Sequence, residues 1–184
     1  NEVGRYSITR PYEAMQIINI IKNQVSTILN KNPKDCVITD GTSGVGGDTL
    51  HFSRHFKCVN AIDILEENIE LLNINCDIFG IKNVKLIHDD YTLLFNDIDQ
   101  DIVYLDPPWG GIGYKDKQKV KLEMSGLQLS EIVSNISTST NPLIFLKLPL
   151  NIDLTDLDIL NKYKILNKKN IPSFYLIQIK QLKH

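Results

Sequence analysis

The sequence predicts an α/β fold: a doubly wound, Rossmann-like domain whose mostly parallel, seven-stranded sheet ends in an antiparallel hairpin. Short apolar runs alternate with segments of helical periodicity, which is the pattern of βαβ units. The last two apolar runs are joined by a loop too short for a crossover helix, so they should pair antiparallel. The length of 184 residues fits a single domain over residues 1–184.

The chain opens with a predicted helix over Pro11–Leu29. A proline suits the first turn of a helix, since its missing N–H would be unsatisfied there in any case. Apolar residues then recur at helical spacing, which predicts one face turned toward the core. These residues are Met15, Ile18, Ile21, Val25 and Ile28.

Seven short runs are predicted to be strands because they are apolar and bounded by turn residues. They are Cys36–Asp40, Cys58–Ile62, Val84–Ile87, Asp101–Leu105, Leu143–Leu148, Tyr163–Leu166 and Phe174–Ile179. Further helices are predicted at Gly47–His55, Glu66–Phe79, Leu127–Ser137 and Leu154–Lys162. In a sheet of this kind, ligands bind beyond the carboxyl ends of the strands, so we expect the chemistry there.

The composition excludes several classes of protein. Hydrophobic residues make up 42% of the chain, enough for a buried core, and no run is long enough for a membrane span. No signal-peptide pattern is present, so we expect an intracellular protein of the cytoplasm or nucleus. The three cysteines lack any metal-site spacing, so neither a disulfide framework nor a metal is expected. The net charge is −2, so a polyanion would need a local basic patch.

A glycine-rich loop, Asp40–Thr49, joins the first strand to the next helix. Its glycines permit a sharp turn and close approach of a ligand to the backbone. It is not a P-loop, because no Gly-Lys-Ser/Thr closes it. The carboxylate of Asp40 would repel a pyrophosphate, but it suits a cationic or zwitterionic ligand.

Asp63 stands at the end of the second strand, where a carboxylate can accept hydrogen bonds from two ribose hydroxyls. A nucleoside with a positively charged, phosphate-free tail suits both this residue and Asp40, and S-adenosylmethionine is the common one. The alternative is structural: the glycines build a tight turn and Asp63 caps a helix. Asp90, after the third strand, is either a partner for the adenine amino group or part of a solvated turn.

The segment Asp106–Gly111, Asp-Pro-Pro-Trp-Gly-Gly, follows the fourth strand. An amine with two N–H bonds can be held by the Asp106 carboxylate and the Pro107 carbonyl, with its lone pair facing a methyl donor. Trp109 offers a face on which a base can stack, a contribution of about 1–3 kcal/mol. A positively charged base would add a cation–π interaction. The alternative, an ordinary core indole, is disfavoured because Trp109 lies between Pro-Pro and Gly-Gly.

Together these motifs resemble those of class I S-adenosylmethionine-dependent methyltransferases that modify exocyclic amines. The longer form, Pro-Pro-Trp-Gly-Gly with Tyr114 just beyond, resembles the trimethylguanosine synthase family, which methylates N2 of the 7-methylguanosine cap of RNA. The resemblance extends from Tyr6 to Asn151. It implies an RNA cap guanosine-N2 methyltransferase that adds one or two methyl groups, turns S-adenosylmethionine into S-adenosylhomocysteine and has capped RNA as its partner.

The resemblance also implies roles for individual residues, with residues 1–31 as an N-terminal helical segment packing on the cofactor side. Asp106, Pro107 and Trp109 would be catalytic. The cofactor would be bound by Ser7, Thr9, Asp40, Gly41, Gly44, Thr49, Asp63, Ile64, Asp90, Tyr91 and Asp106. The substrate would be bound by Pro108, Trp109, Gly110, Tyr114, Lys115, Lys117 and Asn151. Two positions depart from the family pattern: Asp106 replaces a frequent serine, and Leu150 replaces a frequent arginine.

Two lysine-rich stretches are candidates for contacts with RNA phosphates, which would make binding salt-dependent. Lys115–Lys121 follows the tryptophan loop directly, and Ile159–His184 contains lysines but no acidic residue. Either stretch could instead be a solvated surface.

Two other functions are compatible with the sequence. One is an N6-adenine or rRNA guanine-N2 methyltransferase that acts on a flipped base. The other is a catalytically silent subunit that binds the cap or the cofactor. A methylated cap product would distinguish an RNA cap guanosine-N2 methyltransferase from both of these alternatives.

Overall fold

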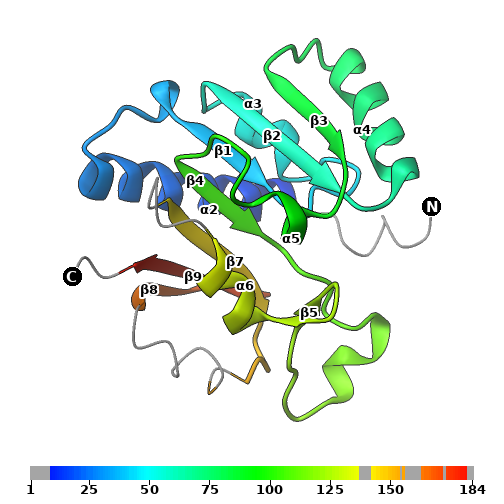
Figure 1. Cartoon of the computed structure of the whole chain (residues 1–184), viewed down its shortest axis with the longest axis vertical. Helices are drawn as coiled ribbons and strands as arrows, with labels where there is room; N and C mark the ends of the chain where they lie inside the picture. The colour runs from blue at the N-terminus through cyan, green and yellow to red at the C-terminus, as the bar shows by residue number, and fades with distance from the viewer. Residues whose placement is uncertain (1–8, 137–141, 154, 156–162, 172, 182–184) are drawn as a thin grey trace.

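The computed structural model describes residues 9–136, 142–153, 155, 163–171 and 173–181 (Figure 1). Its centre is a seven-stranded sheet in the order β3-β2-β1-β4-β7-β9-β8. The strands are β1 Val37–Asp40, β2 Cys58–Asp63, β3 Val84–His88, β4 Ile102–Leu105, β7 Leu143–Pro149, β8 Tyr163–Ile171 and β9 Phe174–Gln181.

The pairing confirms the predicted architecture. Strands β3, β2, β1, β4 and β7 pair in parallel, whereas β9 runs antiparallel to both β7 and β8. The chain builds outward from β1 in both directions, so the carboxyl ends of β1 and β4 flank the switch point at which such sheets bind ligands.

Helices cover both faces of the sheet. They are α2 Pro11–Gln24, α3 Thr49–Ser53, α4 Glu66–Ile78, α5 Tyr91–Leu94 and α6 Leu129–Asn135. Successive residues of β7 point to opposite faces, as in any strand. Phe145 packs in one cluster with Ile17 and Ile18 of α2, and Leu146 packs in another with Ile132 of α6. The helices α2 and α6 therefore lie on opposite faces (Figure 1).

The first helix differs from the prediction in its end and in its buried face. The α-helix ends at Gln24, and Val25–Leu29 forms a π-helical turn that stops at Asn30, which has φ 52°. Met15 is 40% exposed, so its predicted place in the core is wrong. The buried face runs through Ala14, Ile17, Ile18 and Ile21, whose spacing of three, four and seven residues defines a single stripe.

Other predicted helices are shorter than expected. α6 begins at Leu129 because Leu127–Gln128, as β6, pairs with β5, Glu123–Met124, in a small hairpin that was not predicted. The predicted helix Leu154–Lys162 lies outside the described residues, apart from Thr155. The helix α4 agrees closely with the predicted helix Glu66–Phe79. Gly80 follows it with φ +64°, the conformation expected after a helix end.

No helix within the described ranges is long and apolar enough to cross a membrane. Cys36, Cys58 and Cys76 are free thiols. In the part of the chain that the structure describes, no group of three or more His, Cys, Asp or Glu side chains could hold a metal ion.

Candidate active site

The glycine-rich loop leaves the carboxyl end of β1 at Asp40, a fully buried carboxyl group. Thr49 Oγ1, at the start of α3, donates a hydrogen bond of 2.6 Å to Asp40 Oδ2, and the Thr42 N–H donates to Oδ1 over 3.4 Å. Burial, followed by the nearby Asp48 carboxylate, raises the pKa of Asp40 to about 8. A cation beside Asp40 would favour its ionised form, so this position suits a positively charged ligand.

Asp63 ends β2 and joins the glycine-rich loop to the start of α4. Its Oδ2 accepts a hydrogen bond of 2.8 Å from the Gly44 N–H. Its Oδ1 accepts from the Leu65 N–H at 2.9 Å and from Asn68 Nδ2 at 3.0 Å. Asp63 therefore ties the loop to the start of α4, although the N-cap of that helix is Leu65 and not Asp63. Its carboxylate lies at the carboxyl end of β2. The exposed Ile64 follows it, and binding of a ribose by these two residues stays a prediction.

Asp90 is the N-cap of α5, because it accepts hydrogen bonds from the Thr92 N–H at 2.8 Å and from Thr92 Oγ1 at 2.7 Å. The next residue, Tyr91, is buried, and its ring lies directly against Gly41. A Cβ on Gly41 would approach Tyr91 Cγ to 2.8 Å and Leu105 Cδ2 to 2.6 Å, so this position has room only for glycine. The roles of these residues around an adenine stay predictions.

Asp106 begins the Asp-Pro-Pro-Trp loop after β4. Its N–H donates a hydrogen bond of 2.7 Å to Thr42 Oγ1, which links this loop to the glycine-rich loop. Its Oδ2 accepts a hydrogen bond of 2.6 Å from Lys147 Nζ in β7. The prolines differ in environment, since Pro107 is buried and Pro108 is exposed. The two predicted ligand-binding loops therefore meet at one edge of the sheet.

Trp109 is half-buried and contacts the core clusters on both sides of the sheet. The Tyr114 ring packs edge-to-face against it, with 5.2 Å between ring centroids and an interplanar angle of 78°. Gly110 and Gly111, with φ of 92° and 73°, turn the backbone away immediately after the indole. The role of Trp109 as a platform for a base stays a prediction.

Sequence reasoning missed a buried ionic cluster behind this loop, centred on Lys147. Lys147 Nζ donates to Thr9 Oγ1 at 2.7 Å and lies 3.8 Å from Asp48 Oδ2. Asp48 Oδ2 also accepts hydrogen bonds from Thr9 Oγ1 at 2.7 Å and from the Tyr104 hydroxyl at 2.9 Å. A signal was present: a lysine near the carboxyl end of a strand that is otherwise apolar demands a buried partner.

The charges of this cluster favour a cationic ligand. Burial raises the pKa of Asp106 to about 6, although the Lys147 ammonium acts in the opposite direction. Burial by itself would lower the pKa of Lys147, but the carboxylates of Asp106 and Asp48 outweigh it and raise that pKa. Three carboxyl groups, Asp40, Asp48 and Asp106, thus surround a single ammonium among the described residues.

Several predicted substrate residues lie around a cavity of about 420 Å³, which is lined by Tyr114, Lys115, Leu150, Asn151 and Ser173. Asn151 Nδ2 donates hydrogen bonds of 2.8 Å to the carbonyls of Tyr114 and Lys117, so it holds the 3₁₀ helix η3, Ile112–Asp116, and the residue after it. The Lys117 ammonium lies close to Gly110. Contact of any of these residues with RNA stays a prediction.

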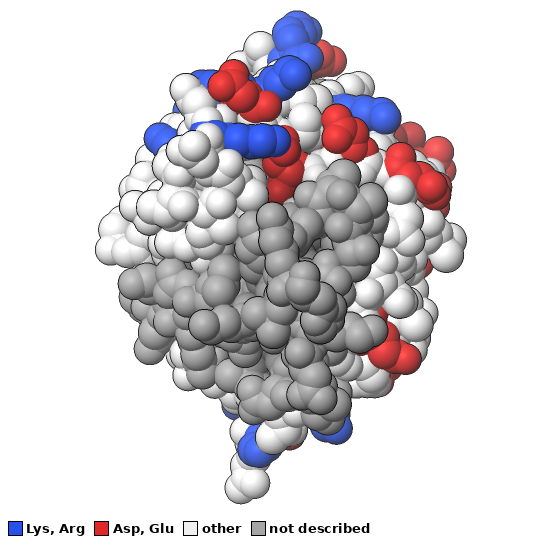
Figure 2. Space-filling model, turned by 60° about the vertical axis from the view of Figure 1, so that its left-hand side comes forward, with Lys and Arg blue, Asp and Glu red and all other residues white. Residues whose placement is uncertain are grey.

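On the face seen in Figure 2, the Lys and Arg side chains of the described part lie among Asp and Glu side chains. Lys119 is 3.6 Å from Asp153, so the stretch after Trp109 is partly neutralised. The side chains of all six lysines in Ile159–His184 lie outside the described residues, as does Ser7.

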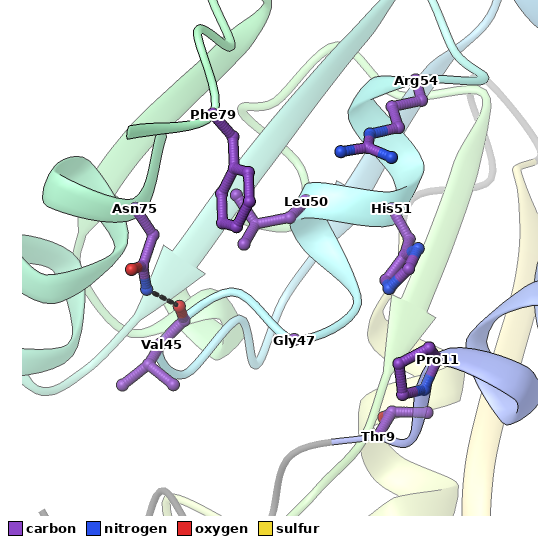
Figure 3. A pocket seen from close by; sticks show the side chains of 9 residues that line it. All are labelled: Thr9, Pro11, Val45, Gly47, Leu50, His51, Arg54, Asn75 and Phe79. Carbon is purple, nitrogen blue, oxygen red and sulfur yellow. Dashed lines mark hydrogen bonds between the residues drawn. The ribbon is translucent and has the colours of Figure 1, made fainter. Parts of the chain in front are cut away.

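A second cavity, of about 330 Å³, lies between the glycine-rich loop and the helices around it (Figure 3). Asn75 of α4 donates a hydrogen bond of 3.0 Å to the Val45 carbonyl at its edge. Leu50 and His51 of α3, Arg54 just after that helix and Phe79 after α4 form much of the wall. Of the predicted site residues that the structure describes, only Thr9 lines this cavity.

The fold and this edge together define a class I S-adenosylmethionine-dependent methyltransferase. The chain belongs to the RNA cap guanine-N2 methyltransferase family, whose model matches residues 35–182. This membership confirms the resemblance inferred from the glycine-rich loop, Asp63 and the Asp-Pro-Pro-Trp-Gly-Gly segment.

Two relatives and one solved structure are similar to this chain. The chain is 34% identical to the uncharacterized protein L320 of Acanthamoeba polyphaga mimivirus, over 95% of this chain and 75% of that protein. It is 26% identical to the trimethylguanosine synthase of Schizosaccharomyces pombe, over 76% of this chain but only 62% of that protein. Among solved structures, SMU.1697c from Streptococcus mutans, crystallised in complex with SAH, matches with a TM-score of 0.59 at 16% identity, over 95% of this chain and 99% of that one. At that identity the likeness shows the fold alone.

Proposed function

We propose that this protein transfers a methyl group from S-adenosylmethionine to the exocyclic N2 of the 7-methylguanosine cap of RNA. The observation that carries the proposal is the half-buried Trp109, which is flanked by Tyr114 and stands three residues after the Asp106 carboxylate. This arrangement offers a face for a base next to an acceptor for its amine. Membership of the RNA cap guanine-N2 family and similarity to a trimethylguanosine synthase support the choice of base.

The residues fit the cofactor. Gly44, with φ +51°, has no atom within 4 Å of where a Cβ would stand, so the backbone of the glycine-rich loop is open to close approach there. Asp40 and the cluster around Lys147 favour a positively charged ligand, and Asp63 supplies acceptors at the end of β2. Asp40, Gly44 and Thr49 would hold the methionine end, and Asp63 the ribose. When bound, S-adenosylmethionine supplies an electrophilic methyl group on a positively charged sulfur.

The protein's main contribution is to orient the amine and exclude water. Alignment of two reactants in a near-attack geometry can lower a barrier by about 7–11 kcal/mol. The Asp106 carboxylate and the Pro107 carbonyl would accept the two N–H bonds, so that the nitrogen lone pair points at the methyl carbon. As the nitrogen–carbon bond forms, the carbon–sulfur bond breaks and its electrons go to sulfur. The nitrogen becomes positive and sheds a proton to Asp106 or to water.

Trp109 would hold the base during this step. A 7-methylguanine carries a positive charge, so stacking on the indole gains a cation–π contribution in addition to dispersion. Lys147 Nζ lies 5.7 Å from the same ring, but its charge is paired with Asp106 and lies close to Asp48. The excess of carboxylates keeps this region compatible with a cationic base.

The test is incubation with labelled S-adenosylmethionine and two dinucleotides, one capped by 7-methylguanosine and the other by unmethylated guanosine. Products are identified by mass. A gain of one or two methyl groups on the 7-methylated cap alone supports the proposal and gives the number of transfers. Transfer to neither cap, with S-adenosylhomocysteine binding intact, overturns it in favour of another RNA base or a silent subunit.

A further inference from the structure

Lys147 is a charged side chain in the interior of the sheet. Its strand, β7, is buried along its whole length, and Lys147 itself is 4% exposed. β7 pairs in parallel with β4 on one side and antiparallel with β9 on the other, where Lys147 lies opposite Leu176. Central strands of a sheet hold their side chains firmly, so the position of this ammonium is fixed by the fold.

The strand register brings Lys147 to Asp106. Leu105 of β4 lies opposite Leu146 of β7, so the residues that follow them are neighbours at the carboxyl edge. Lys147 Nζ donates to Asp106 Oδ2 at 2.6 Å and to Thr9 Oγ1 at 2.7 Å. Thr9 Oγ1 in turn donates a hydrogen bond to Asp48 Oδ2, so the contacts run from Asp106 through Lys147 and Thr9 to Asp48. One Asp106 oxygen is therefore engaged by the protein itself.

A buried carboxyl group without such a partner would favour its protonated form, because burial penalises charge. A protonated carboxyl is a poorer acceptor for an amine N–H and cannot take up a proton. An ammonium at hydrogen-bonding distance opposes this preference and holds the carboxylate in one orientation. The contact of Lys147 with Asp106 has both properties.

We propose that Lys147 is a positioning residue for methyl transfer: it keeps Asp106 ionised and fixes Oδ2, so that Oδ1 receives an N–H of the acceptor amine. The inference rests on the proposed function and extends it by one residue. Lys147 does not itself meet the amine or the methyl group. It acts through Asp106.

The charged and titratable groups that act on Asp106 come from several elements. They are Lys147 of β7, Asp48 before α3, Asp40 of β1, Tyr104 of β4 and Tyr114 of η3. Lys147 is the cation of this set. Its removal should therefore raise the pKa of Asp106 above its value of about 6, since an opposite charge at this range shifts a carboxyl by about 1–3 pH units.

The test compares the full chain with Lys147→Met and Lys147→Arg. In Lys147→Met, we expect the acid limb of the pH profile of kcat to move upward by about one pH unit or more, with S-adenosylhomocysteine affinity changed by less than about threefold. Lys147→Arg keeps a cation, so the acid limb of its pH profile should lie close to that of the wild type. An unchanged acid limb in a folded Lys147→Met protein would overturn the proposal.

A readout without turnover separates this proposal from the proposed function. The carboxyl carbon of Asp106, labelled with carbon-13 and assigned by its loss in Asp106→Asn, should titrate at higher pH in Lys147→Met than in the wild type. If the wild type methylates neither cap, the proposed function fails, and this titration still decides whether Lys147 keeps Asp106 ionised. Equal titration in both proteins would refute that role.

If Lys147→Met does not fold, the double variant Asp106→Asn/Lys147→Met removes both charges of the pair and is compared with Asp106→Asn. A positioning residue that acts through Asp106 should cost no further rate once Asp106 is gone. An additional loss of about tenfold or more in the double variant, equivalent to about 1.4 kcal/mol, would show an independent role for Lys147 and overturn the proposal.

Discussion

At the scale of single residues, Trp109 is the side chain on which recognition of the base depends in the proposed function. It is the only tryptophan of the chain, it is half-buried, and its ring meets Tyr114 edge-to-face. Stacking of a base on an aromatic ring contributes about 1–3 kcal/mol. The loss of this contribution can be measured without turnover.

We expect Trp109→Ala to weaken binding of a 7-methylguanosine-capped dinucleotide by roughly five- to 150-fold, the equivalent of that stacking energy. Isothermal titration calorimetry measures the affinity. Trp109→Phe is the matched variant and should lose less, because it keeps an aromatic face. Unchanged cap affinity in Trp109→Ala would exclude the stacking role.

Asp40 makes stability depend on pH, because its pKa is about 8 in the folded chain against an ordinary value of 3.8. Between those values the folded chain holds a proton that the unfolded chain has lost. The free energy of unfolding therefore falls as pH rises from about 4 to about 8. Asp106, with a pKa of about 6, acts in the same direction over the lower part of this range.

Urea unfolding at pH 5 and pH 8.5 tests this expectation without any ligand. The wild type should be less stable at pH 8.5, and Asp40→Asn should show a smaller difference between the two values. The amide keeps an acceptor for Thr49 Oγ1, so the loop geometry is preserved. An equal pH dependence in both proteins would contradict the assignment of Asp40 as a buried carboxyl group with a raised pKa.

At the scale of elements, the segment from η3 to Lys117 follows Trp109 and carries lysines that the proposed function would bring near the RNA phosphates. Its backbone is held by Asn151, and Lys115 lines the cavity beside Tyr114. The Lys115 ammonium lies 5.9 Å from the centre of the Tyr114 ring. Phosphate contacts from this segment would release counterions and leave a measurable salt dependence.

We expect Lys115→Gln and Lys117→Gln each to reduce the slope of log affinity against log salt by about 0.7 for a capped single-stranded RNA, the value for one phosphate contact. Fluorescence anisotropy at several salt concentrations measures the slope. Lys82→Gln is the control. Lys82 follows α4, and its side chain is 81% exposed and lies 3.6 Å from Asp77 of that helix. If the three variants have the same slope as the wild type, the stretch is a solvated surface.

At the scale of the whole molecule, cofactor binding should be visible as stability. A ligand that binds only the folded state at 100 times its Kd adds about 2.7 kcal/mol to the free energy of unfolding. For a domain of this size that corresponds to a rise in Tm of roughly 5–10 °C. The site joins β1, β2 and β4, so its occupation stabilises the centre of the sheet.

We therefore expect S-adenosylhomocysteine to raise the Tm of the wild type, as measured by calorimetry. Asp63→Asn should have a smaller shift, because its side chain loses one of the two acceptor oxygens at the ribose end. The Tm of the variant without ligand is the control for its lost hydrogen bond to Gly44 or Leu65. A wild type with no shift would contradict the assigned cofactor.

Local patterns in the sequence were enough to predict the order of strands and helices along the chain, the antiparallel end of the sheet and the loops that carry the site. These features depend on local information: apolar period, glycine and proline positions, and loop length. The glycine-rich loop, Asp63 and the Asp-Pro-Pro-Trp segment each follow a strand, so their place at one edge follows from parallel pairing alone. Even the family was evident from these motifs.

Which side chains meet at that edge depends on how distant strands pair. Lys147 and Asp106 are 41 positions apart, and they make contact because β4 and β7 pair in one register. The exposure of Met15 likewise depends on packing in three dimensions. The β5–β6 hairpin, in contrast, has a local signal that the prediction missed: a two-residue Ser125-Gly126 turn in which both residues have positive φ. A charge buried in an apolar strand can be recognised from the sequence as in need of a partner, but the partner is chosen by packing in three dimensions.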